Sequence, residues 1–163
     1  MAKSASQIGR RNRQRGAETE RQIAEILHNE LGMTFKRNLE QVRTAHQGDL
    51  ICDDFGFPFL IEIKRRASGR GVPTGAWEQA YEASQLVNLH PCVIYKYDRY
   101  EARAVVSFNA VAEAFGGKSD QPFLCDLSLL GFCYLTREII NTVWILPLPQ
   151  TNWKWFMQQK GCR

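Results

Sequence analysis

Three charged side chains lie within residues 48–66, the most strand-like part of the sequence. Asp49 begins one apolar run, while Glu62 and Lys64 alternate with isoleucines in the next. Because side chains alternate between the two faces of a strand, Glu62 and Lys64 share one face, about 6–7 Å apart. A carboxylate beside an amine can bind a divalent cation and assist phosphoryl transfer. A half-exposed edge strand with its charges in solvent explains the same alternation without any chemistry.

The segment between these runs sets their register. "DDFGFP" at 53–58 has the composition of a turn, and a six-residue connection places Cys52 opposite Phe59 and Asp49 opposite Glu62. The two carboxylates then face each other with Cβ atoms about 4.5–5.5 Å apart, which is destabilising for like charges. A Mg²⁺ or Mn²⁺ ion offsets this repulsion by taking oxygen ligands from both acids. Lys64 is then placed to stabilise a phosphoryl transition state or to orient an attacking water.

A helix over about 16–31 adds a third acid. Its apolar stripe includes Leu27, and helical geometry puts Glu20 on that side and Glu18 on the solvent side. An acid on a buried stripe is costly unless it is paired or lies near a metal. Glu20 therefore either joins the metal-binding region or sits at the boundary, paired with Arg21 or a nearby base.

The rest of the pattern predicts a mixed α/β fold. "ASGRGVPTG" at 67–75 is typical of a flexible loop, and Gln79 lies at the edge of the apolar face of the helix that follows. Beyond residue 122 the pattern weakens to one more strand or helix and a terminal helix near 152–160. We expect strands at 34–37, 49–52, 59–65, 91–97 and 102–108, and helices at 16–31, 75–89 and 109–115.

Composition narrows the class of protein. The 163 residues are 44% hydrophobic and 23% charged, as expected for one globular domain. No apolar run approaches the roughly 20 residues of a membrane span, which favours a soluble, cytoplasmic protein. The five cysteines form no CxxC pair, and the three histidines are scattered, which argues against a zinc site.

Positive charge is concentrated at the start of the chain. Residues 1–17 hold five basic residues and no acid, whereas the whole chain has a net charge of +4. Such a segment resembles a nucleic-acid-binding arm, although a solvated terminus or a transit peptide has the same composition. We expect a basic arm at 1–15, a core at 16–116, and an extension at 117–163 that packs on the core or forms a dimer interface.

Together these residues resemble the PD-(D/E)xK nucleases. More narrowly, they are similar to the archaeal-type Holliday junction resolvases, which also occur in phage genomes. The similarity covers about residues 10–110, with "GD" in place of the more familiar "PD" before the first strand. The matching positions are Arg15, Gly16, Glu20 and Arg21 in the first helix, Asp49 and "IEIK" with Glu62 and Lys64 in the hairpin, and Gln79 downstream.

The resemblance implies a fold and a role for each site residue. The fold is a restriction-endonuclease-like mixed β-sheet flanked by helices, with an α-β-β-β-α-β core. Asp49 and Glu62 bind Mg²⁺, for which Mn²⁺ can substitute, and the Ile63 carbonyl is a third protein ligand. Glu20 acts in the outer metal shell or holds a second ion. Lys64 assists the nucleophilic water or the charged transition state, and Gln79 orients Lys64 or a water.

The implied reaction is hydrolysis of DNA phosphodiesters, with four-way junctions as substrate. Two symmetric nicks require a C2 homodimer, and the loop 67–75 closes on the DNA. A nuclease for another DNA substrate, in repair, replication or restriction, fits the same motifs. So does a non-catalytic DNA-binding module, and a small α/β protein with solvated charges remains the simplest alternative. The residues expected to contact phosphates are Arg10, Arg11, Arg13, Arg15, Arg65, Arg66 and Arg70.

Overall fold

The computed structural model describes residues 5–39 and 48–145 of the chain. In this part the chain alternates helices and strands, and the predicted α-β-β-β-α-β order is confirmed. The elements are α1 Ala5–Leu31, β1 Phe35–Arg37, β2 Leu50–Cys52, β3 Phe59–Arg66, α2 Ala76–Val87, β4 His90–Tyr97, β5 Arg103–Ser107, α3 Phe108–Ala114, β6 Leu124–Ser128 and α4 Leu129–Ile145.

The strands form one six-stranded sheet in chain order, from β1 at one edge to β6 at the other. β3 and β4 pair in parallel, and the other four neighbouring pairs are antiparallel. A parallel pair requires a crossover connection, and α2 provides it. The sheet is therefore mixed, and its one parallel pair includes β3, the strand that holds Glu62 and Lys64.

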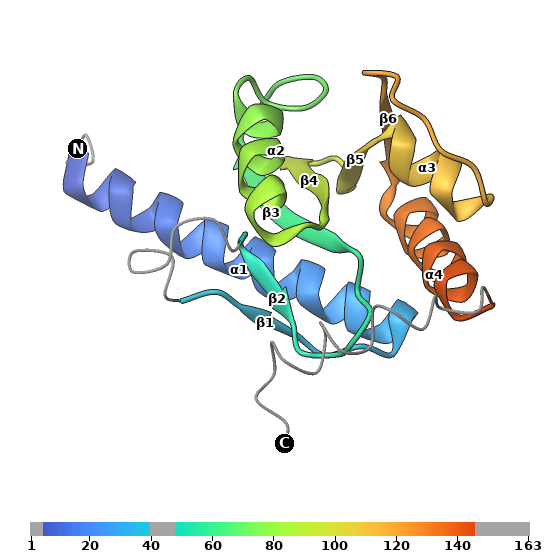
Figure 1. The fold of residues 1–163 in the computed structure, drawn as a ribbon. Helices are drawn as coiled ribbons and strands as arrows, with labels where there is room; N and C mark the ends of the chain where they lie inside the picture. Colours follow the sequence, from blue (N-terminus) through green and yellow to red (C-terminus); the bar gives the residue numbers. More distant parts are fainter. Residues whose placement is uncertain (1–4, 40–47, 146–163) are drawn as a thin grey trace.

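Helices cover both faces of the sheet. Figure 1 shows α2 on one face and α1 and α4 on the other. The main core lies on the second face, where Leu27 of α1 and Phe132 of α4 pack with Ile61, Ile63 and Ile94 of the central strands. Ile61 and Ile63 therefore point toward α1 and α4, which leaves Glu62 and Lys64 on the face toward α2.

Helix α1 begins at Ala5, so the expected start near residue 16 is wrong. The first half of α1 is rich in Arg and Gln, which favour helix, and lacks proline. Its side chains are mostly exposed, so it has no apolar stripe for a periodicity argument to detect. Residues 5–15 thus continue the helix that holds Glu20. The division of the chain into arm, core and extension stays a prediction.

The region beyond residue 122 adds β6 at the edge of the sheet and the 17-residue helix α4. Helix α4 contributes Phe132, Cys133 and Ile139 to the core. The sequence hid this helix because Leu130 and Tyr134 are apolar yet 61% and 58% exposed, which blurs the helical period. The helix expected near 152–160 lies outside the described residues. No helix in the described part is long and apolar enough to cross a membrane.

Candidate active site

The hairpin of β2 and β3 has the predicted register. Leu50 pairs with Ile61 as predicted, and the ladder ends there: Asp49 lies in a bend just before β2, and the charge of its carboxyl still acts on Glu62. Two hydrogen bonds fix Asp49 against β3. Its backbone N–H donates to the Ile61 carbonyl oxygen at 2.7 Å, and its Oδ2 accepts from the Ile63 N–H at 2.5 Å. The carboxylate of Asp49 is therefore oriented by the strand that holds Glu62.

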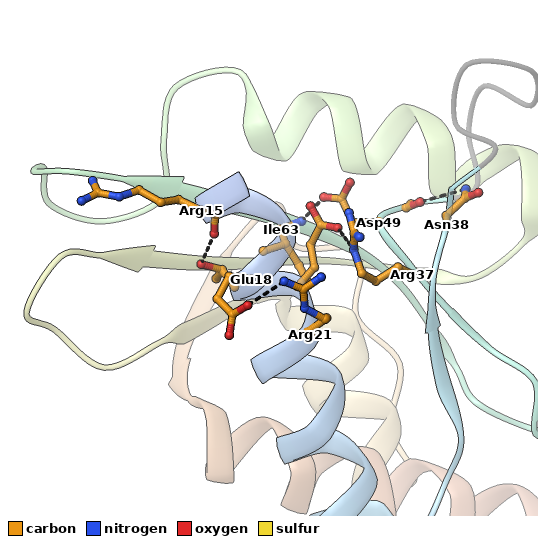
Figure 2. A network of polar contacts seen from close by, with 10 residues as sticks. Arg15, Glu18, Arg21, Arg37, Asn38, Asp49 and Ile63 are labelled. Atoms are coloured by element: carbon orange, nitrogen blue, oxygen red, sulfur yellow. Dashed lines mark hydrogen bonds and ion pairs between the residues drawn. The ribbon is translucent and has the colours of Figure 1, made fainter. Parts of the chain in front are cut away.

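Gly48 explains why "GD" precedes this hairpin. Its φ is +72°, and a Cβ there would lie 2.5 Å from the Ile61 carbonyl oxygen, so a side chain does not fit. The buried Asn38 holds the same turn, because its Nδ2 donates to the Gly48 carbonyl at 3.1 Å. Figure 2 shows this contact beside Asp49. Asn38 was missed in the sequence, where "NLEQVRTAHQG" has the composition of an exposed loop; only its position after β1 marks it.

Glu62 is a buried acid, with 7% of its surface exposed. Burial raises the pKa of its carboxyl, and the charges of Asp49 and Glu20 raise it further, against the opposing effect of Lys64. The protein therefore holds a carboxylate in a position where its charge is disfavoured. A cation at this place relieves that cost.

Lys64 contacts groups from two elements. Its Nζ lies 2.6 Å from Glu62 Oε1 on its own strand and donates to Gln79 Oε1 of α2 at 3.0 Å. Two oxygen acceptors thus hold the ammonium group on the α2 face of the sheet. The predicted neighbourhood of Glu62, Lys64 and Gln79 is present, and the role of each residue stays a prediction.

Helix α1 presents its two acids as the helical wheel predicts. Glu18 pairs with Arg21 at 2.6 Å, and both side chains are more than half exposed. Glu20 is 20% exposed and accepts from Arg37 Nε of β1 at 2.5 Å. Figure 2 shows Arg37 next to Asp49 and Ile63. Glu20 is thus paired at the edge of the core, with Arg37 rather than Arg21 as its partner. Its charge still raises the pKa of Glu62.

The oxygen groups here suit a hard cation. Asp49, Glu62 and the backbone of Ile63 come together, and carboxylate and carbonyl oxygens are the ligands that Mg²⁺ prefers. Among residues 5–39 and 48–145, no three His, Cys, Asp or Glu side chains gather closely enough to hold an ion on their own. A ligand set of two acids and a carbonyl therefore stays a prediction, and Glu20 is bonded to Arg37.

Two of the arginines expected to contact DNA share one acid. Asp98, in the turn after β4, lies 3.8 Å from Arg15 of α1 and is bonded to Arg65 at the end of β3. The other five stand on surface positions of α1, the end of β3 and the following loop. Arg10, Arg11, Arg13, Arg66 and Arg70 are exposed.

The loop 67–75, expected to be flexible, is attached to β4. The Tyr97 hydroxyl donates to the Gly71 carbonyl at 2.9 Å. A Cβ at Gly69 would lie 2.5 Å from the Tyr97 ring, so the loop packs against Tyr97 only with glycine there. Arg70 is therefore presented between two fixed points.

Comparison with known proteins places these features in a family. Residues 11–125 match the family model described as "Phage putative PDDEXK endonuclease". The chain belongs to this family. The matched range includes Glu20, Asp49, Glu62, Lys64 and Gln79, and it ends within β6.

A solved structure is also similar to this chain. It is Hjc, a Holliday junction resolvase from the archaeal hyperthermophile Archaeoglobus fulgidus, with 19% sequence identity and a TM-score of 0.43. The similarity covers 55% of this chain and 70% of the resolvase chain. No match was found among curated proteins.

Proposed function

We propose that this protein is a Mg²⁺-dependent endonuclease that hydrolyses DNA phosphodiesters at four-way junctions, with Mn²⁺ able to replace Mg²⁺. One observation supports the chemistry above all. Asp49 is bonded to the Ile63 N–H and its charge acts on Glu62, and Lys64 is held between Glu62 and Gln79. Membership of the phage PDDEXK endonuclease family supports the reaction class.

The proposed metal ligands are the carboxylates of Asp49 and Glu62 and the carbonyl of Ile63. A bound divalent cation supplies Lewis acidity and lowers the pKa of a coordinated water. The Ile63 N–H fixes the rotation of the Asp49 carboxylate through its bond to Oδ2. Glu20, positioned by Arg37, adds negative charge in the outer shell or toward a second ion.

Lys64 is proposed to place its positive charge beside the reacting phosphate or its attacking water. Its Nζ is held by Glu62 Oε1 and Gln79 Oε1, so part of its conformational entropy is already lost before DNA binds. Gln79 acts through Lys64 as a positioning residue.

DNA binding is proposed to use the exposed arginines of α1 together with those at and after the end of β3, with residues 1–15 as the basic arm. The junction substrate follows from the resolvase-like pattern of Arg15, Gly16, Glu20 and Arg21 in α1. Paired nicks on such a substrate require a C2 homodimer, to which residues 117–163 contribute either as an interface or by packing on the core. The proposed biological role of this cutting is DNA recombination or repair in the host cytoplasm.

The test is incubation of the full chain with a four-way junction and a linear duplex of the same arm sequence, with and without Mg²⁺. We expect Mg²⁺-dependent cutting of the junction at a rate at least about tenfold above that of the duplex, a difference of about 1.4 kcal/mol in activation free energy. Equal cutting of both substrates would show a nuclease for another DNA structure. Junction binding without cutting, in either Mg²⁺ or Mn²⁺, would show a non-catalytic DNA-binding module.

A further inference from the structure

The turn between β4 and β5 presents an aromatic side chain to solvent. Tyr100 is 69% exposed. Its backbone is nevertheless fixed, because its N–H donates to the Tyr97 carbonyl at 3.2 Å and its own carbonyl accepts from Lys96 Nζ at 2.6 Å. An exposed ring on a fixed backbone has few conformations to lose when a flat ligand packs on it.

The residue before Tyr100 has an unfavourable backbone conformation. Arg99 has φ +69°, a left-handed value that costs about 1–2 kcal/mol for a residue with a Cβ. Among the described residues, Asn88 is the other non-glycine residue with positive φ, and it ends α2, where Asn is common. A glycine at residue 99 would relieve the strain but would remove a positive charge next to Tyr100. Strain of this kind concentrates at functional sites.

The turn between β4 and β5 lies beside the end of β3, the strand that holds Glu62 and Lys64. The Asp98 N–H donates to the Arg66 carbonyl at 3.2 Å, and the Asp98 carboxylate contacts both Arg65 and Arg15. Lys64 is two residues before Arg66 on β3, a rise of about 6–7 Å. Figure 2 shows Arg15 at the end of the sheet away from Asn38, so α1 reaches this place as well.

We propose that Tyr100 stacks on an unpaired or unstacked base of the bound DNA. The inference rests on the proposed nuclease function and narrows its substrate to DNA with an exposed base face, as at a branch point. Stacking on an aromatic ring accepts any base, because every base has a π-face. In a continuous duplex the bases stack on one another and offer no free face. Arg99, the preceding residue, supplies a positive charge for the flanking phosphate.

The test measures binding in metal-free buffer, where no cutting occurs. The probes are a four-way junction and a linear duplex of the same arm sequence, each with 2-aminopurine at the position that adjoins the branch in the junction. The variants are Tyr100→Ala, Tyr100→Phe and Tyr100→Trp. Tyr81→Ala is the matched control, because Tyr81 is likewise an exposed tyrosine, 50% exposed on α2.

We expect Tyr100→Ala to lower the ratio of junction to duplex affinity by about tenfold, the loss typical of one aromatic–base stack. The change in 2-aminopurine emission on junction binding should disappear as well. Tyr100→Phe and Tyr100→Trp should keep both signals, and Tyr81→Ala should match the wild type. The thermal midpoint of each variant, measured beside the wild type, separates loss of binding from loss of fold.

Two results would overturn the stacking proposal. One is an affinity ratio within twofold of the wild type for a folded Tyr100→Ala variant. The other is an equal loss in Tyr100→Phe, which would assign the effect to the hydroxyl. The nuclease proposal is judged separately by wild-type cutting in Mg²⁺. Absence of cutting with a Tyr100-dependent affinity ratio would reject the reaction and keep the stacking contact, and the reverse result would do the opposite.

Discussion

Two groups of polar side chains lie on the same face of the sheet, and they are balanced differently. On β4, β5 and β6, Asp126 accepts from Arg103 Nε at 2.8 Å and from the Tyr95 hydroxyl at 2.6 Å. On β3, Glu62 and Lys64 pair at 2.6 Å, yet the charge of a second carboxylate, Asp49, also acts on Glu62. The first group contains its own counter-charge. The second has more negative charge than its lysine neutralises.

The pKa values express this difference. Burial, and then the bond to Asp126, raise the pKa of Tyr95 to about 12, so its phenol remains a hydrogen-bond donor at any physiological pH. Burial and the charges of Asp49 and Glu20 raise the pKa of Glu62, so its ionised form is disfavoured where it stands. A polar cluster whose hydrogen bonds and charges are balanced contributes to the fold. A cluster that retains unbalanced negative charge is a candidate for ligand binding.

The largest expected effect follows from removing the carboxylate of Asp49 or of Glu62. Asp49→Asn and Glu62→Gln should each lower junction cutting by at least about 100-fold, the scale of losing one key electrostatic group. Junction affinity, measured without metal, should remain within about threefold, because the expected phosphate contacts are arginines elsewhere. The measurement is single-turnover cutting together with a binding titration.

Asp126→Asn is the matched control, since it changes an acid on the same sheet face without touching the proposed ligands. It should cut at a rate within about twofold of the wild type. If Asp126→Asn loses as much activity as Glu62→Gln, the difference between the two polar groups has no functional meaning. Normal cutting by Glu62→Gln would place the active site elsewhere.

The second prediction separates Lys64 from the residue that holds it. Lys64→Ala should lower kcat by about 100-fold, because it removes a charge from the transition state. Gln79→Ala should lower kcat by about tenfold with KM within twofold, since it removes only one of two acceptors of Lys64. The measurement is steady-state cutting of the junction.

A positioning role for Gln79 requires non-additivity, so the double variant is the decisive control. With Lys64 already absent, Gln79→Ala should cost less than twofold more. A further tenfold loss in the double variant would show that Gln79 acts on substrate or water independently of Lys64.

Much of this site was predictable because strand alternation and turn length are strict geometric rules. The six-residue connection at 53–58 was enough to predict the register in which Leu50 pairs with Ile61, and the structure confirms that pair; the ladder ends before Asp49. The helical wheel separated Glu20 from Glu18 for the same reason, and their exposures agree. Local periodicity determines which face a side chain takes, without knowledge of the rest of the fold.

Long-range pairings were not predictable in this way. Arg37 reaches Glu20 across 17 positions, and Asn38 fixes Gly48 across 10, and neither spacing has a local period. The first half of α1 was missed because it has no apolar stripe, and α4 could not be told from a strand because exposed apolar residues such as Leu130 and Tyr134 blur its helical period. Tertiary packing, rather than local pattern, decides such elements.

The third prediction concerns the free energy of unfolding and tests the group of Tyr95, Arg103 and Asp126, whose charges balance one another. Tyr95→Phe removes the hydrogen bond to Asp126 from a residue that is 5% exposed. We expect a loss of about 1 kcal/mol in the free energy of unfolding, the usual net value of one such bond. Urea unfolding with and without the substitution provides the number. Cutting should be unaffected, and a loss of activity without a loss of stability would make this group functional after all.

The smallest expected effect is a gain in stability rather than a loss, and it concerns Glu62, whose charge is only partly neutralised by Lys64. Because the pKa of Glu62 is raised in the folded state, its ionised form is less favourable there than in the unfolded chain. Glu62→Gln should therefore stabilise the metal-free protein at pH 8, by less than Tyr95→Phe destabilises it. The gain should shrink as the pH falls toward 4.5, the ordinary value for this group, since Glu62 then becomes protonated and the difference from Gln is lost. Thermal midpoints in chelator from pH 8 to pH 5 measure the trend.

Added Mg²⁺ should reverse the order of stability of the two proteins, because an ion bound by Asp49 and Glu62 stabilises only the wild type. A wild type that is more stable than Glu62→Gln at pH 8 in chelator would show that Lys64 already compensates Glu62, and the argument for a missing cation would fail.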